Sequence, residues 1–385
     1  MFYRQSWTLA LCTSITLSFT LSVLWKRQSP KSQTKAAPVA SNGVRPDPIF
    51  PCWSMAQKSS HMPIAPVLDA EQCWELGQNL KTGPVPERLV KRWILRQLKL
   101  MQNCSWTHNA SALDQYRAQL GLCCNASARL LLTQENTPLG SELVYDGQPT
   151  KKLKVQEDLW KILPQGSPFQ GPLYEYCAVV GNGGILRNSS CGPEIDRAQF
   201  VIRFNLPPMG FLEDVGTKSS IITLNPSVLQ SRFSGLNHHR RPFAEAVGAY
   251  GASLLLIPAF SFPGHKERAF QVLYTLEDFG SPARTRFMNP KYLGALDGHW
   301  RRHGFRTRRL SSGFMLVSAA LELCQHLTLY GFWPFSQAPD GRPLSHHYYD
   351  NQGPKPGYHT MPAEFTHYLA MHLHGALRLH LGCCR

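Results

Sequence analysis

Residues 176–229 constrain the fold of this 385-residue chain more than any other stretch. Residues 177–180 (Cys-Ala-Val-Val) form a short apolar run, and residues 181–184 (Gly-Asn-Gly-Gly) follow it directly. An apolar run closed by glycines predicts a buried strand that ends in a tight turn. Because glycine has no Cβ, the backbone N–H groups of such a turn can come close to a phosphate. We therefore expect an anionic ligand at this turn.

The spacing of these glycines speaks against a dinucleotide-binding site. The fingerprint of such sites needs a third glycine, at position 186 in this chain, where it lets a helix pack closely on the strand. Leu186 occupies that position. A glycine-rich turn by itself is also a common structural connector, so the neighbouring segments have to decide between the two interpretations.

Further along the chain, strand-like runs alternate with helical or irregular segments. Apolar runs cover residues 200–204, 221–224 and 253–258, and a helical pattern covers residues 269–279. This alternation is typical of an α/β fold in which helices flank a mostly parallel sheet.

A second candidate site lies at residues 310–335. Ser311 or Ser312 is a good helix N-cap, Gly313 allows close approach, and a strand is expected at residues 327–332. The exposed N-terminus of a helix can bind phosphate, because its first N–H groups are unpaired and its dipole favours negative charge. An isolated Ser-Ser-Gly would, however, be an ordinary helix cap.

Several histidines follow this segment, among them His346, His347 and His359, and Glu364 comes five residues after the last of them. Histidine titrates near neutral pH and can act as a general base. The C-terminal histidines have no cysteine or carboxylate partner at a standard ligand spacing, so we expect no metal site. These C-terminal histidines are His367, His372, His374 and His380.

Taken together, these segments resemble the sequence motifs of the sialyltransferases, and most of all those of the α2,8 branch. The resemblance covers residues 110–384 and includes all four motifs in order. Ser312 stands where that branch more often has threonine, which keeps the hydroxyl. The segments that carry the resemblance are 177–184, 203–208, 214–216 and 225–227 for the large motif, 310–335 for the small motif, 345–351 for the third motif, and His359 with Glu364 for the very small motif.

The resemblance implies a Rossmann-like glycosyltransferase domain, a variant of the GT-A type. It implies an inverting transfer of sialic acid from CMP-sialic acid to the 8-hydroxyl of a terminal sialic acid on a glycolipid or glycoprotein. His359 matches the general base, and no metal or cofactor is implied. The residues implied to bind the donor are Asn182, Asn205, Ser311, Ser312, Gly313, Trp333, His346 and His347. The family also suggests two disulfides, Cys177–Cys324 and Cys191–Cys384.

The N-terminal part of the chain predicts a membrane anchor. Residues 6–25 carry no charge and are long enough to span a bilayer, and no small-residue cleavage pattern follows them closely. The basic residues mainly follow this span, against the positive-inside rule, but so do most of the 11 cysteines and all N-glycosylation sequons. We therefore expect a single-pass type II protein of the Golgi membrane with its catalytic domain in the lumen. The sequons lie at Asn103, Asn109, Asn125 and Asn188.

The expected domain order follows from this orientation. Residues 1–5 form a cytoplasmic tail, residues 6–25 the anchor, residues 26–85 a flexible stem rich in Pro, Ser, Lys and Gln, and residues 86–385 the catalytic domain.

Two helices are expected before the first strand of the sheet. Residues 86–101 form an amphipathic pattern that either docks on the core or presents its basic face to a membrane or an anionic acceptor. A second helix is expected at residues 110–131. It contains Cys123 and Cys124, and because adjacent cysteines rarely bond each other, we expect each to have a separate partner.

The net charge of +15 favours an anionic partner, which could be a nucleic acid, a membrane surface or an acidic glycan. Residues 284–309 contain eight basic residues, and Asp297 is the single acid among them. This run is either a solvated face or part of the acceptor site. The cysteines and sequons that favour a lumenal location argue against a nucleic-acid partner.

One alternative function has a different character, namely a catalytically inactive membrane protein of the same fold that binds sialylated glycans. The acceptor class, the number of sialic acids added and the oligomeric state stay open. Residues before the sheet resemble the branch that contains the ganglioside and oligosialyl enzymes.

Overall fold

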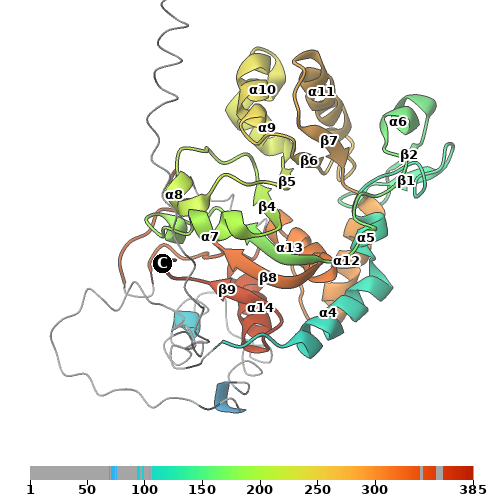
Figure 1. The fold of residues 1–385 in the computed structure, drawn as a ribbon. Helices are drawn as coiled ribbons and strands as arrows, with labels where there is room; N and C mark the ends of the chain where they lie inside the picture. The colour runs from blue at the N-terminus through green and yellow to red at the C-terminus, as the bar shows by residue number, and fades with distance from the viewer. Residues whose placement is uncertain are drawn as a thin grey trace, which may run out of the picture. The chain divides into compact units, whose positions relative to one another are not determined.

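The computed structural model describes residues 69, 71–73, 75, 93–95, 98, 104, 106–338, 341–352 and 359–384. Its centre is a seven-stranded sheet in the order β7–β6–β5–β4–β3–β8–β9, in which every neighbouring pair is parallel (Figure 1). The predicted α/β fold with a mostly parallel sheet is confirmed. The strands are β3 (Tyr174–Val180), β4 (Phe200–Phe204), β5 (Ile221–Thr223), β6 (Leu254–Ile257), β7 (Arg284–Phe287), β8 (Cys324–Tyr330) and β9 (Arg378–His380).

The chain winds in two directions from β3. It first runs outward through β4, β5, β6 and β7, and then returns to the other side of β3 with β8 and β9. A separate antiparallel hairpin, β1 (Glu142–Val144) with β2 (Lys152–Lys154), precedes the sheet. The helices are α4 (Ala110–Cys123), α5 (Ala126–Arg129), α6 (Glu157–Ile162), α7 (Gly192–Arg197), α8 (Leu212–Val215), α9 (Pro226–Phe233), α10 (Arg240–Gly248), α11 (His265–Asp278), α12 (Pro290–Arg302), α13 (Ser312–Leu323) and α14 (Met361–Leu373).

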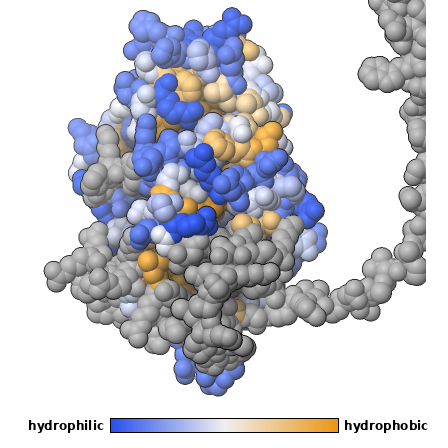
Figure 2. All heavy atoms as spheres, turned by 90° about the vertical axis from the view of Figure 1, so that its left-hand side faces the viewer, coloured by the Kyte–Doolittle hydropathy of each residue, from blue (hydrophilic) through white to orange (hydrophobic). Residues whose placement is uncertain are grey.

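Both faces of the sheet are covered, which explains why the central strands β4 and β5 are buried along their whole length. Side chains alternate along β3: Val179 packs with α12, α13 and α14 on one face, whereas Val180 packs with α7 and α8 on the other. At the other end, α9, α10 and α11 gather beside β5, β6 and β7 (Figure 1). Hydrophobic side chains on the surface form separate patches between hydrophilic ones on the face shown in Figure 2.

Helix α13 is the central helix of the domain. All its residues from Phe314 to Leu323 are buried, because α4, α12 and the sheet pack around it. The helix begins at the Ser311 cap and ends directly at Cys324, the first residue of β8. The βαβ arrangement expected for residues 310–335 is therefore present, and its strand starts three residues earlier than predicted.

The helix predicted at residues 110–131 is broken in two, so this prediction is wrong in its second half. Helix α4 ends at Cys123, and α5 begins at Ala126. Between them, Asn125 adopts a left-handed conformation with φ 58° and caps α5 by accepting a hydrogen bond from the Ala128 N–H. Asparagine tolerates this conformation better than most residues, and the chain can therefore turn here.

The expectation of separate partners for Cys123 and Cys124 is also wrong. The two are bonded to each other, with their Cα atoms 3.8 Å apart. This pairing occurs at the end of α4, where the chain leaves helical geometry. Cys177–Cys324 and Cys191–Cys384 are both bonded as the resemblance suggested, and Cys73 is bonded to Cys104.

The predicted anchor and most of the predicted stem lie outside the described residues. Among the residues that the structure describes, no helix has the length and hydropathy needed to cross a membrane. Only part of the predicted helix at residues 86–101 is described, and there Ile94 and Leu98 are buried in the main core. Their burial favours a docked amphipathic helix.

Candidate functional site

The predicted site residues gather at the carboxyl edge of the sheet. In doubly wound sheets, ligands bind where the strand order changes direction, outside the carboxyl ends of the two strands concerned. In this chain these strands are β3 and β8, which end at Val180 and Tyr330. The glycine turn at residues 181–184 follows β3, and Gly331, Phe332 and Trp333 follow β8.

The glycine turn serves packing rather than phosphate contact. Its N–H groups donate to protein carbonyls: Gly181 to Tyr330 at 2.7 Å, Gly183 to Gly331 at 3.0 Å and Gly184 to His346 at 3.2 Å. A Cβ on Gly183 would stand 2.4 Å from the Gly331 carbonyl oxygen. The expectation that these amides approach a ligand is therefore wrong for these three residues. Absence of a Cβ is needed because other parts of the backbone pass so close.

Three asparagines mark the carboxyl ends of three adjacent strands. The Nδ2 of Asn182, after β3, donates to the Phe204 carbonyl at 3.0 Å. The Oδ1 of Asn205, after β4, accepts from the Asn225 N–H at 3.1 Å, and Asn225, after β5, bonds the Ser312 hydroxyl at 3.3 Å. This chain of contacts joins both predicted donor-binding asparagines to the N-terminus of α13. Sequence reasoning placed Asn225 in the large motif but gave it no role.

Asn182 and Asn205 each have an unusual feature. The Oδ1 of Asn182 is buried and has no hydrogen-bond partner among the described residues. Asn205 has a positive φ of 63°, and Leu206 follows with φ 50°. Non-glycine residues in this region cost free energy, and such conformations are concentrated at functional sites.

The N-terminus of α13 is the best anion site in this part of the molecule. Ser311 caps the helix by accepting from the Phe314 N–H at 3.1 Å, while the Ser311 N–H itself donates to Glu364 at 2.8 Å. Within the described part of the chain, the N–H groups of Ser312 and Gly313 have no acceptor. Both residues are half-buried. Two unpaired amides at the end of a 12-residue helix suit a phosphate group.

Glu364 anchors this end of α13 by hydrogen bonds. Its carboxyl lies in the first turn of α14, is buried, and accepts hydrogen bonds from both the N–H and the hydroxyl of Ser311. Burial raises the pKa of Glu364 to about 7, although the two hydrogen bonds from Ser311 oppose that change. Glu364 therefore holds the cap of α13 through Ser311.

His359 lies just before α14 and is half-buried. Its Nδ1 bonds the carbonyl oxygen of Arg309 at 3.0 Å, which makes Nδ1 the protonated nitrogen of the neutral ring and leaves the lone pair on Nε2. Burial lowers the pKa of His359, and the nearby positive charge of Arg309 lowers it further, against the effect of the carbonyl bond. The ring is therefore held as a neutral base below its usual titration range.

His346 and His347 lie in the loop that packs on the glycine turn. The Tyr348 N–H donates to the Asn182 carbonyl at 2.9 Å, which fixes this loop beside β3. The Nδ1 of His347 bonds Asp350 at 2.7 Å. Burial, together with the neighbouring ring of His347, lowers the pKa of His346. Burial alone would raise the pKa of Asp350, but hydrogen bonds from the Gln352 N–H and from His347 hold it below its usual value.

Trp333 lies deeper than the other predicted donor-binding residues. Its side chain is buried against Phe335 and Phe365, and its indole N–H donates to the Gln337 carbonyl at 2.9 Å. Phe332, which the sequence did not single out, is half-buried instead. Its ring lies 3.2 Å from the position of a Cβ on Gly181 and 3.1 Å from that of a Cβ on Gly313, so it fills the space between the two motifs.

The basic run at residues 284–309 does not form one surface. Arg284 is exposed at the amino end of β7, the edge strand, and the candidate site lies at the opposite end of the sheet. Arg309 forms an ion pair with Asp146 at 2.8 Å. Arg306 and Arg308 are exposed in the loop that leads to Arg309 and α13. Only this last part of the run is therefore close in sequence to the candidate site.

The predicted glycosylation residues differ in exposure. Asn109 caps α4, and Asn188 lies in a turn; both are exposed. Asn125 is half-buried, and its Oδ1 accepts from Ser127 and Ala128. Asn103 lies outside the described residues.

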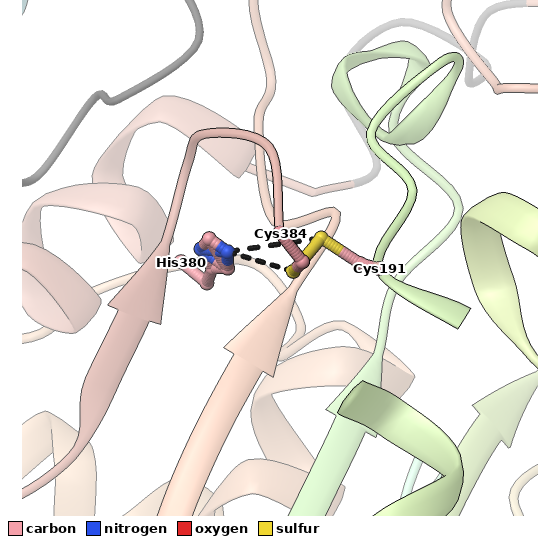
Figure 3. Close-up of side chains that lie close together, drawn as sticks. All are labelled: Cys191, His380 and Cys384. Atoms are coloured by element: carbon pink, nitrogen blue, oxygen red, sulfur yellow. Dashed lines mark hydrogen bonds between the residues drawn. A yellow bond between two sulfur atoms is a disulfide. The ribbon is translucent and has the colours of Figure 1, made fainter. Parts of the chain in front are cut away.

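A cavity of about 1010 Å³ lies between α4, α12 and α14. None of the predicted catalytic or donor-binding residues lines it, but Arg306 of the basic run does. His380 lies beside the Cys191–Cys384 disulfide, with its Nε2 at 3.0 Å from the Cys384 sulfur and 3.7 Å from the Cys191 sulfur (Figure 3). A metal would need thiolate ligands, and a disulfide offers none. This histidine therefore has cysteine neighbours that its sequence spacing did not suggest.

The fold and the site define a Rossmann-like α/β domain with its candidate site at the switch point of the sheet. Comparison with known proteins identifies the family. A family model described as glycosyltransferase family 29 (sialyltransferase) matches residues 131–376. This chain belongs to that family.

Three curated relatives illustrate the similarity. Alpha-2,8-sialyltransferase 8E of Homo sapiens is 39% identical over 318 residues, which cover 82% of this chain and 85% of that protein. Alpha-2,8-sialyltransferase 8F of Mus musculus is 36% identical over 392 residues and 97% of each chain. Alpha-N-acetylneuraminide alpha-2,8-sialyltransferase of Bos taurus is 42% identical over 287 residues, covering 74% of this chain and 80% of that protein. The resemblance found in the sequence motifs is thereby confirmed.

Proposed function

We propose that this protein transfers sialic acid from CMP-sialic acid to the 8-hydroxyl of a terminal sialic acid. Membership of the sialyltransferase family supports the donor, and relatives that are named α-2,8-sialyltransferases support the acceptor. The observation that carries the proposal is the hydrogen bond from His359 Nδ1 to the Arg309 carbonyl. It holds the neutral imidazole against a carbonyl group that lies two residues before Ser311, the cap of α13.

In this proposal the N-terminus of α13 binds the donor phosphate. The unpaired N–H groups of Ser312 and Gly313 and the positive end of the helix dipole stabilise its negative charge. Asn182, Asn205 and Asn225 hold the rest of the donor from the ends of β3, β4 and β5. Burying the Asn182 Oδ1 without a partner costs free energy, which a hydrogen bond from the donor would recover.

The reaction needs a base on one side of the donor and charge stabilisation on the other. The Nε2 of His359 takes the proton of the acceptor hydroxyl while that oxygen attacks C2 of the donor sialic acid. The bond between C2 and the phosphate oxygen breaks, its electron pair leaves with CMP, and the configuration at C2 is inverted. The α13 terminus and His347, whose Nδ1 is engaged by Asp350, stabilise the departing phosphate without a metal.

The lowered pKa of His359 suits this role. A base that is neutral below pH 6.5 stays active in a mildly acidic compartment. We propose that this compartment is the Golgi lumen, reached by a type II anchor at residues 6–25 followed by a stem, as the uncharged N-terminal stretch and the disulfides of the catalytic domain suggest. We also propose that the catalytic domain is a GT-A-like variant of the glycosyltransferase fold.

One assay tests the proposal. Full-length protein is mixed with CMP-sialic acid and a panel of gangliosides, O-glycans and N-glycans that end in sialic acid, and both CMP release and the linkage of the product are measured. Acceptor-dependent CMP release with an α2,8-linked product is the expected result. Glycan binding without acceptor-dependent CMP release would instead support the inactive, sialoglycan-binding alternative.

A further inference from the structure

We propose that Asp146, in the turn of the β1–β2 hairpin, is a positioning residue for the catalytic imidazole of His359 and acts through Arg309. This inference rests on the proposed function. Asp146 lies 213 positions before His359 in the chain, outside every motif that the sequence analysis used. The family model begins upstream of it, but no motif residue points to it.

The ion pair between Asp146 and Arg309 is largely withdrawn from solvent. Asp146 Oδ2 lies 2.8 Å from Arg309 Nη1, and the side chains are 5% and 20% exposed, respectively. Exposed ion pairs contribute little to the stability of the folded state. Removing one partner of a buried pair, in contrast, leaves an uncompensated charge in the interior and is destabilising. The guanidinium also donates to the Ser261 hydroxyl at 2.8 Å and lies over the Phe262 ring, 5.5 Å from its centroid. Its position is therefore set by three contacts.

The hairpin that carries Asp146 is itself held in place. The Gly147 N–H donates to the Ser261 carbonyl at 2.9 Å. A Cβ on Gly147 would stand 2.4 Å from the Phe262 ring, so glycine is needed for the hairpin to approach this closely. The turn at residues 145–147, the loop after β6 and the segment before α13 thus meet at one point.

The other end of Arg309 holds His359. The carbonyl oxygen of Arg309 accepts from His359 Nδ1 at 3.0 Å and from the Thr307 hydroxyl at 3.3 Å. Thr307 in turn contacts the Thr360 hydroxyl at 3.3 Å. A shift of the Arg309 side chain would move its carbonyl and, with it, the imidazole. Misplacing a catalytic group by about 1 Å can lower the rate by about 100-fold.

Arg309 affects the protonation of His359 as well as its position. Arg309 is the charged group that acts on His359 directly, and its own charged or titratable neighbours include Asp146 from the hairpin and His265 from the start of α11. Glu364, on α14, bonds Ser311 two residues beyond Arg309. Removing the negative charge of Asp146 leaves Arg309 uncompensated, which disfavours the imidazolium form and lowers the pKa of His359. Removing the positive charge of Arg309 has the opposite effect.

The test compares full-length parent protein with Asp146→Asn and Arg309→Gln in the transfer assay. We expect Asp146→Asn to lower kcat by about 10- to 100-fold, with a change of less than about two-fold in KM for CMP-sialic acid. The acidic limb of the kcat/KM profile should move to lower pH in Asp146→Asn and to higher pH in Arg309→Gln. Asp146→Glu, which keeps the charge, should keep the parent limb. Asp278→Asn, which breaks the exposed Arg240–Asp278 ion pair, is the matched control and should leave all parameters unchanged.

The outcomes separate this inference from the proposed function. A parent protein without transfer activity overturns the proposed function. An active parent together with an Asp146→Asn protein of unchanged kcat and unchanged acidic limb overturns only the role of Asp146. If Asp146→Asn does not fold, Ser261→Ala removes a second anchor of Arg309, and an unchanged kcat in that variant would overturn the inference instead.

Discussion

The carboxyl group of Glu364 accepts two hydrogen bonds from Ser311, one from its N–H and one from its hydroxyl. These residues are 53 positions apart, in the very small and the small motif. The contact joins the first turn of α14 to the cap of α13. A single buried carboxyl therefore links the helix that follows His359 to the proposed phosphate site.

The buried carboxyls should make stability fall as pH rises. Glu364 and Glu322 both have pKa values raised to about 7 by burial, compared with 4.5 for the unperturbed group. The folded state therefore binds more protons than the unfolded state between pH 4.5 and 7, and stability present below pH 4.5 is lost through that window. Glu364→Gln should remove up to about 1.4 kcal/mol per pH unit of this slope. Denaturant unfolding at pH 5, 6 and 7 measures it.

Glu322→Gln is the matched comparison for that prediction. Glu322 accepts from the Ala126 N–H on the far side of α13 and touches no proposed site residue. It should reduce the pH slope in the same way while leaving transfer activity unchanged. A slope in Glu364→Gln equal to that of the parent would contradict the proposed protonation of Glu364.

His359→Ala should lower kcat by about 10² to 10⁴, the contribution typical of a general base. Binding of CMP-sialic acid, measured by calorimetry, should survive because the proposed donor contacts come from other residues. His374→Ala is a suitable control, since His374 caps the opposite end of α14. If His359→Ala binds donor and still transfers at the parent rate, His346 and His347 become the next candidate bases.

The acidic limb of the parent kcat/KM profile should have its midpoint below pH 6.5. Burial and the charge of Arg309 lower the pKa of His359, so the neutral base persists to lower pH than an exposed histidine would. The activity should rise with pH through this pKa. Initial rates between pH 4.5 and 8 measure the profile, and a limb above pH 6.5 would contradict the proposed environment of the base.

The disulfides should differ widely in their effect on stability. Cys177–Cys324 closes a loop of 147 positions between β3 and the start of β8, worth about 5 kcal/mol in the chain-entropy model. Cys123–Cys124 closes the smallest ring a disulfide can make, worth about 1 kcal/mol in the same model. Replacing both cysteines of each pair by alanine should therefore destabilise the first variant far more in denaturant unfolding. Mapping of unreduced peptides should find Cys123 and Cys124 in one peptide, 2 mass units lighter than its reduced form.

Arg306→Gln with Arg308→Gln should raise KM for a sialylated acceptor in a salt-dependent way. Both residues are exposed beside the segment that holds His359, and an acceptor ending in sialic acid carries a carboxylate. KM for the donor should not change. Arg284→Gln, at the opposite end of the sheet, is the control. Identical acceptor KM values at low salt would leave only a solvated role for Arg306 and Arg308.

The sequence by itself determined five strands of the sheet (β3, β4, β5, β6 and β8), the central helix and the motif residues, but it did not predict β7, β9 or the β1–β2 hairpin. Runs such as residues 200–204 and the Ser311 cap follow from local periodicity and local hydrogen bonding, which a single segment carries with it. Residues such as Asn205 and His359 were found because their motifs contain them in a recognisable order. The resemblance to the family was sufficient to pair Cys177 with Cys324.

Only the tertiary structure decided how these residues are used. The glycine turn at residues 181–184 has the composition of a phosphate-binding loop, yet its amides bond carbonyls of Tyr330, Gly331 and His346, segments more than 140 positions away. Asp146 likewise has no local signal, because its partner Arg309 comes from another part of the chain. Such contacts depend on which segments the fold brings together. A buried polar group gains or loses free energy according to the partner that it meets in the folded state, and a local stretch of sequence does not specify that partner.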